Sequence, residues 1–80
     1  MHMEPAKTII DRMGGVEAVA AITGRHVSRV YRWMYPRERG GTDGLIPQLE
    51  ARKLLTHARA SNISLSADEF FSAPAPAEAS

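Results

Sequence analysis

Apolar residues recur at helical spacing through most of the chain, and no stretch gives a convincing strand pattern. The pattern predicts five short helices, at residues 5–13, 16–23, 26–34, 47–61 and 66–71. Gly14 and Gly24 follow the first two, at positions where a helix often ends in a residue that tolerates a positive φ. Pro36 ends the third, because the residue before a proline avoids the helical region. We therefore expect an all-α fold.

Three of the predicted helices carry a stripe of apolar or small residues along one side. The stripes consist of Ala6, Ile9, Ile10 and Met13 in the first, Val16, Val19, Ala20 and Thr23 in the second, and Ala51, Leu54, Leu55 and Ala58 in the fourth. Ser66 and Glu69 have the spacing of a capping box, which predicts the last short helix through Phe71. Residues 35–46 are rich in turn formers and are predicted as a loop. Together these elements predict a compact bundle of four to five short helices.

The length of 80 residues allows one small domain, which we place at residues 1–71. Residues 72–80, SAPAPAEAS, have nothing to bury, and we expect a disordered tail rich in alanine and proline. The chain has no cysteine, which excludes disulfides and cysteine-based metal sites. No apolar run approaches the roughly 20 residues that span a bilayer, and no signal peptide is visible. We therefore expect a cytoplasmic protein without a membrane partner.

Positive charge is concentrated in one segment, although the net charge of the chain is only +1. Residues 25–39 contain five arginines against one acidic residue, Glu38, which gives this segment a net charge of +4. The rest of the chain has five lysines and arginines against eight acidic residues, a net charge of −3. Tyr31, Trp33 and Tyr35 are interleaved with the arginines. Such a cluster indicates an anionic partner, most often nucleic acid, unless it is simply a solvated basic face.

Residues 16–34 have the features of two short helices that meet at a steep angle. Ala20 is small where the two backbones approach each other, and Gly24 can adopt the left-handed conformation of the turn. Val19, Val30 and Trp33 are placed to hold the second helix onto the first. Once that side is buried, the opposite side of helix 26–34 faces solvent. An α-helix fits the DNA major groove, and the N-terminal half of such a helix contacts the base edges.

The run GGVEAVAAITGRHVSRVYRW resembles the helix-turn-helix of the lambda Cro/repressor-like superfamily. The matching positions are Val19, Ala20, Gly24, Val30 and Trp33. The downstream run RERGGTDGLIP is similar to a narrower group, the small prophage-type Cro-like regulators of the carph-isopro type, in which a glycine loop leads into Ile-Pro. Together these resemblances cover residues 8–71. The chain departs from the superfamily at Thr23 and Arg25, where apolar residues are usual beside the turn glycine.

The resemblance implies sequence-specific binding of double-stranded DNA, as a homodimer and usually in repression. By matching position, the residues that would face the major groove are Val27, Ser28, Tyr31 and Arg32. Helical geometry adds His26 and Arg29. We place Arg25 near phosphate, and Arg37 and Arg39 against phosphate or a neighbouring minor groove. Arg29 and Arg32 suit the O6 and N7 acceptors of guanine, at roughly 1–3 kcal/mol of discrimination for each bidentate pair.

The sequence also fits functions other than repression, and it leaves the role of the C-terminal apolar residues undecided. The basic side formed by His26, Arg29 and Arg32 also fits an acidic surface of another protein, which would make the chain an adaptor. A transcription activator would use the same groove chemistry as a repressor. The C-terminal apolar residues either form the homodimer surface or close the core against Leu54 and Leu55. These residues are Ile63, Leu65, Phe70 and Phe71.

No residue pattern predicts catalysis, a cofactor or a small-molecule substrate. His2, His26 and His57 lack the spacing of metal ligands, so no metal site is expected. The glycines of GGTDG lack the lysine and the strand-to-helix context of a phosphate-binding loop. The sequence therefore predicts a binding protein and not an enzyme.

Overall fold

The computed structural model describes residues 3–71, and these residues form helices and loops with no strand. The helices are α1 (Ala6–Arg12), α2 (Val16–Thr23), α3 (Val27–Arg32) and α4 (Gln48–Ala60), with the 3₁₀ turns η1 (Arg37–Arg39) and η2 (Ala67–Phe70). The predicted all-α bundle of short helices, including a helix-turn-helix, is confirmed. The predicted tail, residues 72–80, lies outside the described residues.

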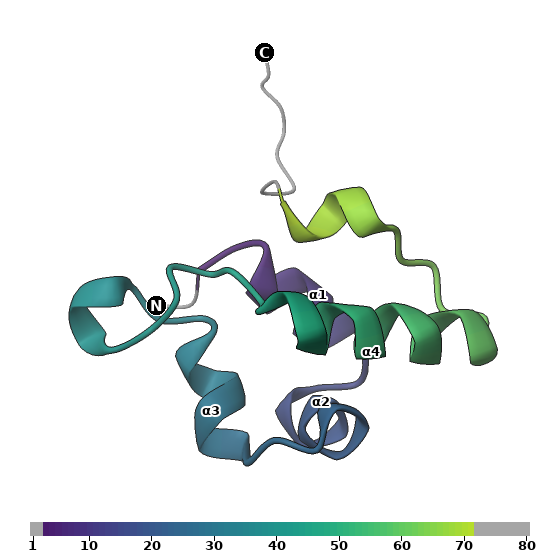
Figure 1. Cartoon of the computed structure of the whole chain (residues 1–80), viewed down its shortest axis with the longest axis horizontal. Helices are drawn as coiled ribbons and strands as arrows, with labels where there is room; N and C mark the ends of the chain where they lie inside the picture. Colours follow the sequence, from purple (N-terminus) through teal and green to yellow (C-terminus); the bar gives the residue numbers. More distant parts are fainter. Residues whose placement is uncertain (1–2, 72–80) are drawn as a thin grey trace.

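The longest helix, α4, crosses the middle of the molecule (Figure 1). On one side of it lie α2 and α3, and on the other side lies η2, while α1, which contacts α2 and η2, lies behind α4 in this view. In this view α2 is seen end-on and α3 runs down the page, so the two helices cross steeply, as predicted for residues 16–34. The turn that joins them is residues 24–26.

The core consists of the predicted stripes together with residues from the loops. Its buried members are Ala6, Ile9, Ile10, Met13, Val19, Val30, Trp33, Met34, Ile46, Ala51, Leu54, Ala58 and Phe70. Trp33 is the largest of these side chains and is only 1% exposed. It lies directly after α3 and beside the buried Val30, so the C-terminal end of α3 is fixed to the core. Burying large apolar side chains of this kind contributes about 2 kcal/mol each.

The glycine turns lie where the sequence predicted them, and helix ends differ from the predictions by one or two residues. Gly24 ends α2 in the left-handed conformation, with φ 75°. The third helix ends at Arg32 and not at residue 34. After Arg32 the chain continues in a tighter turn, in which the amides of Trp33, Met34 and Tyr35 each donate to the carbonyl three residues earlier. The predicted loop at residues 35–46 contains η1, which the turn formers in the sequence did not reveal.

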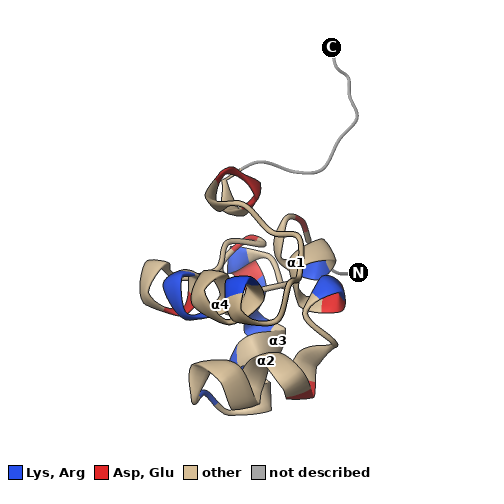
Figure 2. Cartoon of the chain, turned by 90° about the vertical axis from the view of Figure 1, so that its right-hand side faces the viewer, with Lys and Arg blue, Asp and Glu red and all other residues tan. Residues whose placement is uncertain are grey.

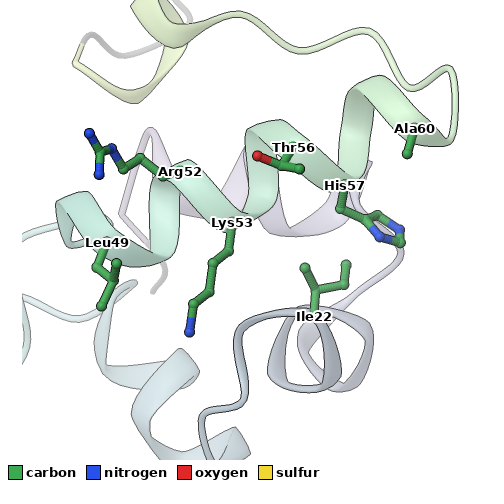
Figure 3. A pocket seen from close by; sticks show the side chains of 7 residues that line it. All are labelled: Ile22, Leu49, Arg52, Lys53, Thr56, His57 and Ala60. Atoms are coloured by element: carbon green, nitrogen blue, oxygen red, sulfur yellow. The ribbon is translucent and has the colours of Figure 1, made fainter.

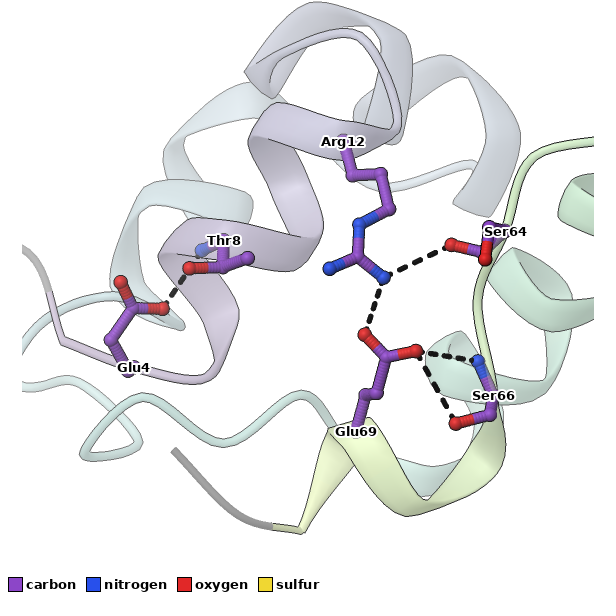
Figure 4. Close-up of polar contacts among 6 residues, drawn as sticks. All are labelled: Glu4, Thr8, Arg12, Ser64, Ser66 and Glu69. Carbon is purple, nitrogen blue, oxygen red and sulfur yellow. Dashed lines mark hydrogen bonds and ion pairs between the residues drawn. The ribbon is translucent and has the colours of Figure 1, made fainter. Parts of the chain in front are cut away.

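The C-terminal segment covers the core through η2. Ser66 and Glu69 form the predicted capping box, and the Arg12 guanidinium of α1 bonds both Glu69 and the carbonyl of Ser64 (Figure 4). Phe70 is buried, so this residue closes the core of the monomer. Phe71 is 81% exposed and is not part of the core. At the other end of α1, the Glu4 carboxylate accepts from the Thr8 amide at 2.9 Å (Figure 4).

Candidate nucleic-acid interface

Helix α3 is held to the core on one side and exposed on the other. Val30 is its only fully buried residue, and Trp33 and Met34 anchor the turn that follows it. The exposed side, which we call the α3 face, consists of His26, Ser28, Arg29, Tyr31 and Arg32. Val27, also a predicted groove residue, is half-buried at the start of the helix. The arginine-bearing side of α3 therefore faces solvent, as a recognition helix requires.

Two arginines of the α3 face have no carboxylate to neutralise them. Among residues 3–71, neither Arg29 nor Arg32 forms an ion pair or a side-chain hydrogen bond. The acidic residues Asp68 and Glu69 belong to η2, which lies at the opposite end of the molecule from α2 and α3 (Figure 2). The guanidinium donors of the α3 face are consequently available to an external acceptor.

His26 caps the start of α3, a role that sequence reasoning missed. Its Nδ1 accepts from the backbone N–H of Ser28 at 3.1 Å and lies 3.0 Å from the Ser28 hydroxyl. An accepting Nδ1 carries no proton, so the neutral imidazole has its proton on Nε2. The cap therefore leaves an N–H donor at the exposed end of the ring. Asn, Asp, Ser and Thr are the usual caps, and the histidine at this position gave no comparable signal.

Arg25 forms an ion pair with another part of the protein, although its side chain is still 38% exposed and the sequence predicted it near phosphate. Its Nε donates to Glu50 of α4 at 2.5 Å, and the Glu50 side chain is only 5% exposed. A carboxylate buried to this degree needs a charged partner, so Arg25 is first of all the counter-ion of Glu50. The neighbouring Thr23 is buried as well, and its hydroxyl donates to the carbonyl of Val19 at 2.8 Å. The side chains of Thr23 and Arg25, the two residues that depart from the superfamily pattern, thus both have hydrogen-bond partners within the protein.

The glycine loop holds the C-terminal end of α3. The carbonyl of Arg32 accepts from the amide of Thr42 at 3.1 Å, and that of Tyr35 accepts from the amide of Asp43 at 2.9 Å. The Arg32 carbonyl, which also accepts from the amide of Tyr35, and the Tyr35 carbonyl are thus both bonded to the loop just beyond the end of α3. Gly41 passes so close to the carbonyls of Tyr35 and Arg32 that a side chain there has no room. The loop therefore fixes the backbone from which Arg32 projects.

Arg37 and Arg39 lie on η1, which projects at one end of the molecule away from α2 (Figure 1). The amide and the guanidinium of Arg37 both donate to Asp43, at 2.6 and 3.2 Å. These hydrogen bonds, the one from the amide first, hold the pKa of Asp43 below its ordinary value. Arg39 is exposed and has no ion pair in the described part of the chain. The α3 face lies on an α-helix, whereas Arg37 and Arg39 lie on the short 3₁₀ helix that follows it in the chain.

Comparison with protein-family models, curated proteins and solved structures found no match to this chain. Within residues 3–71, no helix is both long and apolar enough to cross a membrane. The same residues bring together no group of three His, Asp or Glu side chains suited to a metal ion.

Proposed function

We propose that the protein is a sequence-specific regulator of transcription, a repressor, that places α3 in the major groove of double-stranded DNA. The observation that carries this proposal is the α3 face, a row of exposed donors on a helix whose other side is fixed to the core. A rigid helix keeps its side chains in register with base edges, which a flexible basic segment cannot do. The resemblance to Cro-like regulators agrees with this placement.

Within this proposal the residues have separate tasks. Arg29 and Arg32 donate to guanine O6 and N7, because a guanidinium presents two parallel N–H groups. His26 donates from Nε2 to a phosphate or a base acceptor, since its Nδ1 is occupied by the cap. Ser28 and Tyr31 complete the polar contacts, and Val27 contacts a thymine methyl group. Arg39 neutralises phosphate, which adds affinity without sequence preference.

We further propose that two copies bind together, because one recognition helix contacts too few base pairs for high specificity. The exposed Phe71 borders a groove that is lined by Ile46, Ala51, Leu55 and Phe70 among others. An exposed aromatic ring beside an apolar groove is typical of protein–protein contacts. Of the C-terminal residues predicted for the dimer, Phe71 is the one that the monomer core leaves exposed to this degree.

The experiment that tests this function is selection of bound fragments from a random duplex pool, followed by gel retardation at two salt concentrations. The proposal predicts enrichment of one sequence, bound more weakly as salt rises and competed poorly by random duplex. No retardation of any duplex would favour the adaptor, in which the α3 face binds an acidic protein surface. Retardation without enrichment of a sequence would exclude base readout.

A further inference from the structure

Glu50 is a buried carboxylate that the function proposed above does not use. Its side chain lies on α4 and is only 5% exposed, and the Nε of Arg25 donates to it at 2.5 Å. Replacement of a buried ion pair by apolar side chains is often neutral or stabilising. Stability alone therefore does not explain why a carboxylate is buried at this position.

Glu50 holds the guanidinium of Arg25 by one nitrogen and leaves the other two nitrogens unbonded. Nε donates to the carboxylate, whereas Nη1 and Nη2 donate to no group within residues 3–71. The Arg25 side chain is 38% exposed, so part of it remains open to solvent. Because the guanidinium is planar and rigid, the bond at Nε also restricts the directions of the remaining N–H bonds. Such paired N–H bonds match two oxygens of a phosphate.

Arg25 lies in the turn that precedes α3, beside the helix that we place in the major groove. This turn is residues 24–26, and the next residue after Arg25 is the exposed His26, whose cap leaves an Nε2–H donor free. Phosphates line both rims of the major groove, so a helix that enters the groove brings its N-terminal turn close to the DNA backbone. The position of Arg25 in the chain therefore suits a contact with phosphate.

The ion pair with Glu50 does not make this turn electrically neutral. Lys53 extends from α4 toward the end of α2 (Figure 3), and its Nζ donates to the carbonyl of Thr23 at 3.1 Å. Thr23 precedes Arg25 by two residues, so Arg25 and Lys53 bring two positive charges to the turn against one carboxylate. A phosphate that approaches the turn is consequently attracted even though Glu50 is ionised.

We propose that Glu50 is a positioning residue for DNA binding, which holds the guanidinium of Arg25 ready to bind one phosphate of the DNA backbone beside α3. This inference rests on the proposed function and adds to it a residue that does not touch DNA. Arg25 donates from Nη1 and Nη2 to the phosphate while its Nε stays bonded to Glu50. Because the side chain is already ordered in the free protein, DNA binding loses less side-chain entropy.

The test compares Glu50→Gln with Glu50→Leu in their affinities for a selected duplex and a random duplex, by fluorescence anisotropy. Both substitutions remove the negative charge, but only glutamine keeps an oxygen that accepts from the Nε of Arg25. We expect Glu50→Leu to bind both duplexes about fivefold more weakly than Glu50→Gln, because the released arginine has to be ordered on binding. The ratio of the two affinities should be the same in both variants, since a phosphate contact carries no sequence preference.

The double variant Arg25→Met, Glu50→Leu provides a second test that does not depend on the single variants. It removes one charge of each sign, so the net charge of the protein is kept, and an apolar pair replaces a buried ion pair well. We expect it to bind both duplexes about tenfold more weakly than the wild type, because one charge-assisted contact is lost. The slope of affinity against salt should fall by about one.

Equal affinities of the two Glu50 variants, or wild-type affinity of the double variant, would overturn the proposal. If Glu50 only neutralised Arg25, both single variants would bind more tightly than the wild type and equally. Loss of sequence preference in Glu50→Leu would also overturn it, because Glu50 would then act on the orientation of α3. These outcomes are seen only if the wild type binds a duplex. A wild type that retards no duplex would instead contradict the proposed function itself, so the two failures are distinguishable.

Discussion

Arg25, in the turn between α2 and α3, donates a hydrogen bond of 2.5 Å to the buried carboxylate of Glu50 on α4. This ion pair connects the turn before α3, residues 24–26, to α4, the longest helix of the bundle. A second bond, from Lys53 of α4 to the carbonyl of Thr23, ties the preceding residues to the same helix at 3.1 Å. The orientation of α3 therefore depends on α4 through polar contacts as well as through the core.

Removal of Arg25 should destabilise the protein more than an exposed ion pair would. We expect Arg25→Ala to lower the free energy of unfolding by about 2 kcal/mol, because it leaves a buried carboxylate without its partner. Urea denaturation measures this quantity. The double variant Arg25→Met, Glu50→Leu should recover most of the loss, since apolar pairs replace buried ion pairs well. Equal stability of Arg25→Ala and the wild type would show that the pair contributes little.

The cap formed by His26 can be separated from any DNA contact by choice of substitution. His26→Ala should cost about 1 kcal/mol of stability, because the amide of Ser28 loses its acceptor. His26→Asn should restore stability, since asparagine caps helices well, but should not restore DNA affinity if Nε2–H is a contact. Thermal unfolding and fluorescence anisotropy measure the two effects. If His26→Asn recovered both the stability and the DNA affinity of the wild type, the role of His26 would be limited to capping α3.

Acid should weaken the attachment of η2. The side-chain hydrogen bond from Arg12, and after it the amide of Ser66, hold the pKa of Glu69 below its ordinary value of 4.5. A carboxyl whose pKa is lower in the folded state stabilises the fold above its unfolded pKa, and this contribution is lost as the pH falls below 4.5 and through the folded value.

Urea midpoints measured against pH test this linkage. Glu69→Gln should be less stable than the wild type at neutral pH and should lose less stability below pH 4.5. Glu17→Gln removes an exposed carboxylate that has no ion pair among residues 3–71 and is the matched control. The same acid dependence in both variants would contradict the assignment.

A methyl group at position 41 should disturb the end of α3. Gly41→Ala brings a Cβ against the carbonyls of Tyr35 and Arg32, so either the loop or the end of α3 has to move. Gly40→Ala meets nothing within 4 Å and costs only backbone strain at its positive φ of 81°, about 1 kcal/mol. Amide chemical shifts should change at Arg32 and Thr42 in the first variant and much less in the second. Equal changes in both would show that crowding at Gly41 is unimportant.

The fold was largely predictable because helical spacing and glycine placement both act locally. The stripe of Ile9, Ile10 and Met13 and the left-handed Gly24 needed no knowledge of the tertiary structure. The pairing of Arg25 with Glu50 was not predictable, because the two residues lie far apart in the sequence. From residue type alone, an arginine and a glutamate are expected to be charged surface residues.

The central claim is that α3 reads base edges while η1 contacts only the backbone of DNA. The most direct measurement compares Arg32→Ala and Arg39→Ala in their affinities for a selected duplex and a random one, across a range of salt concentrations. We predict that Arg32→Ala loses about 1–3 kcal/mol on the selected duplex and so loses sequence preference. Arg39→Ala should weaken both duplexes alike and reduce the salt slope by about one. If both variants instead affect the two duplexes equally, α3 is not a reading helix and the account is contradicted.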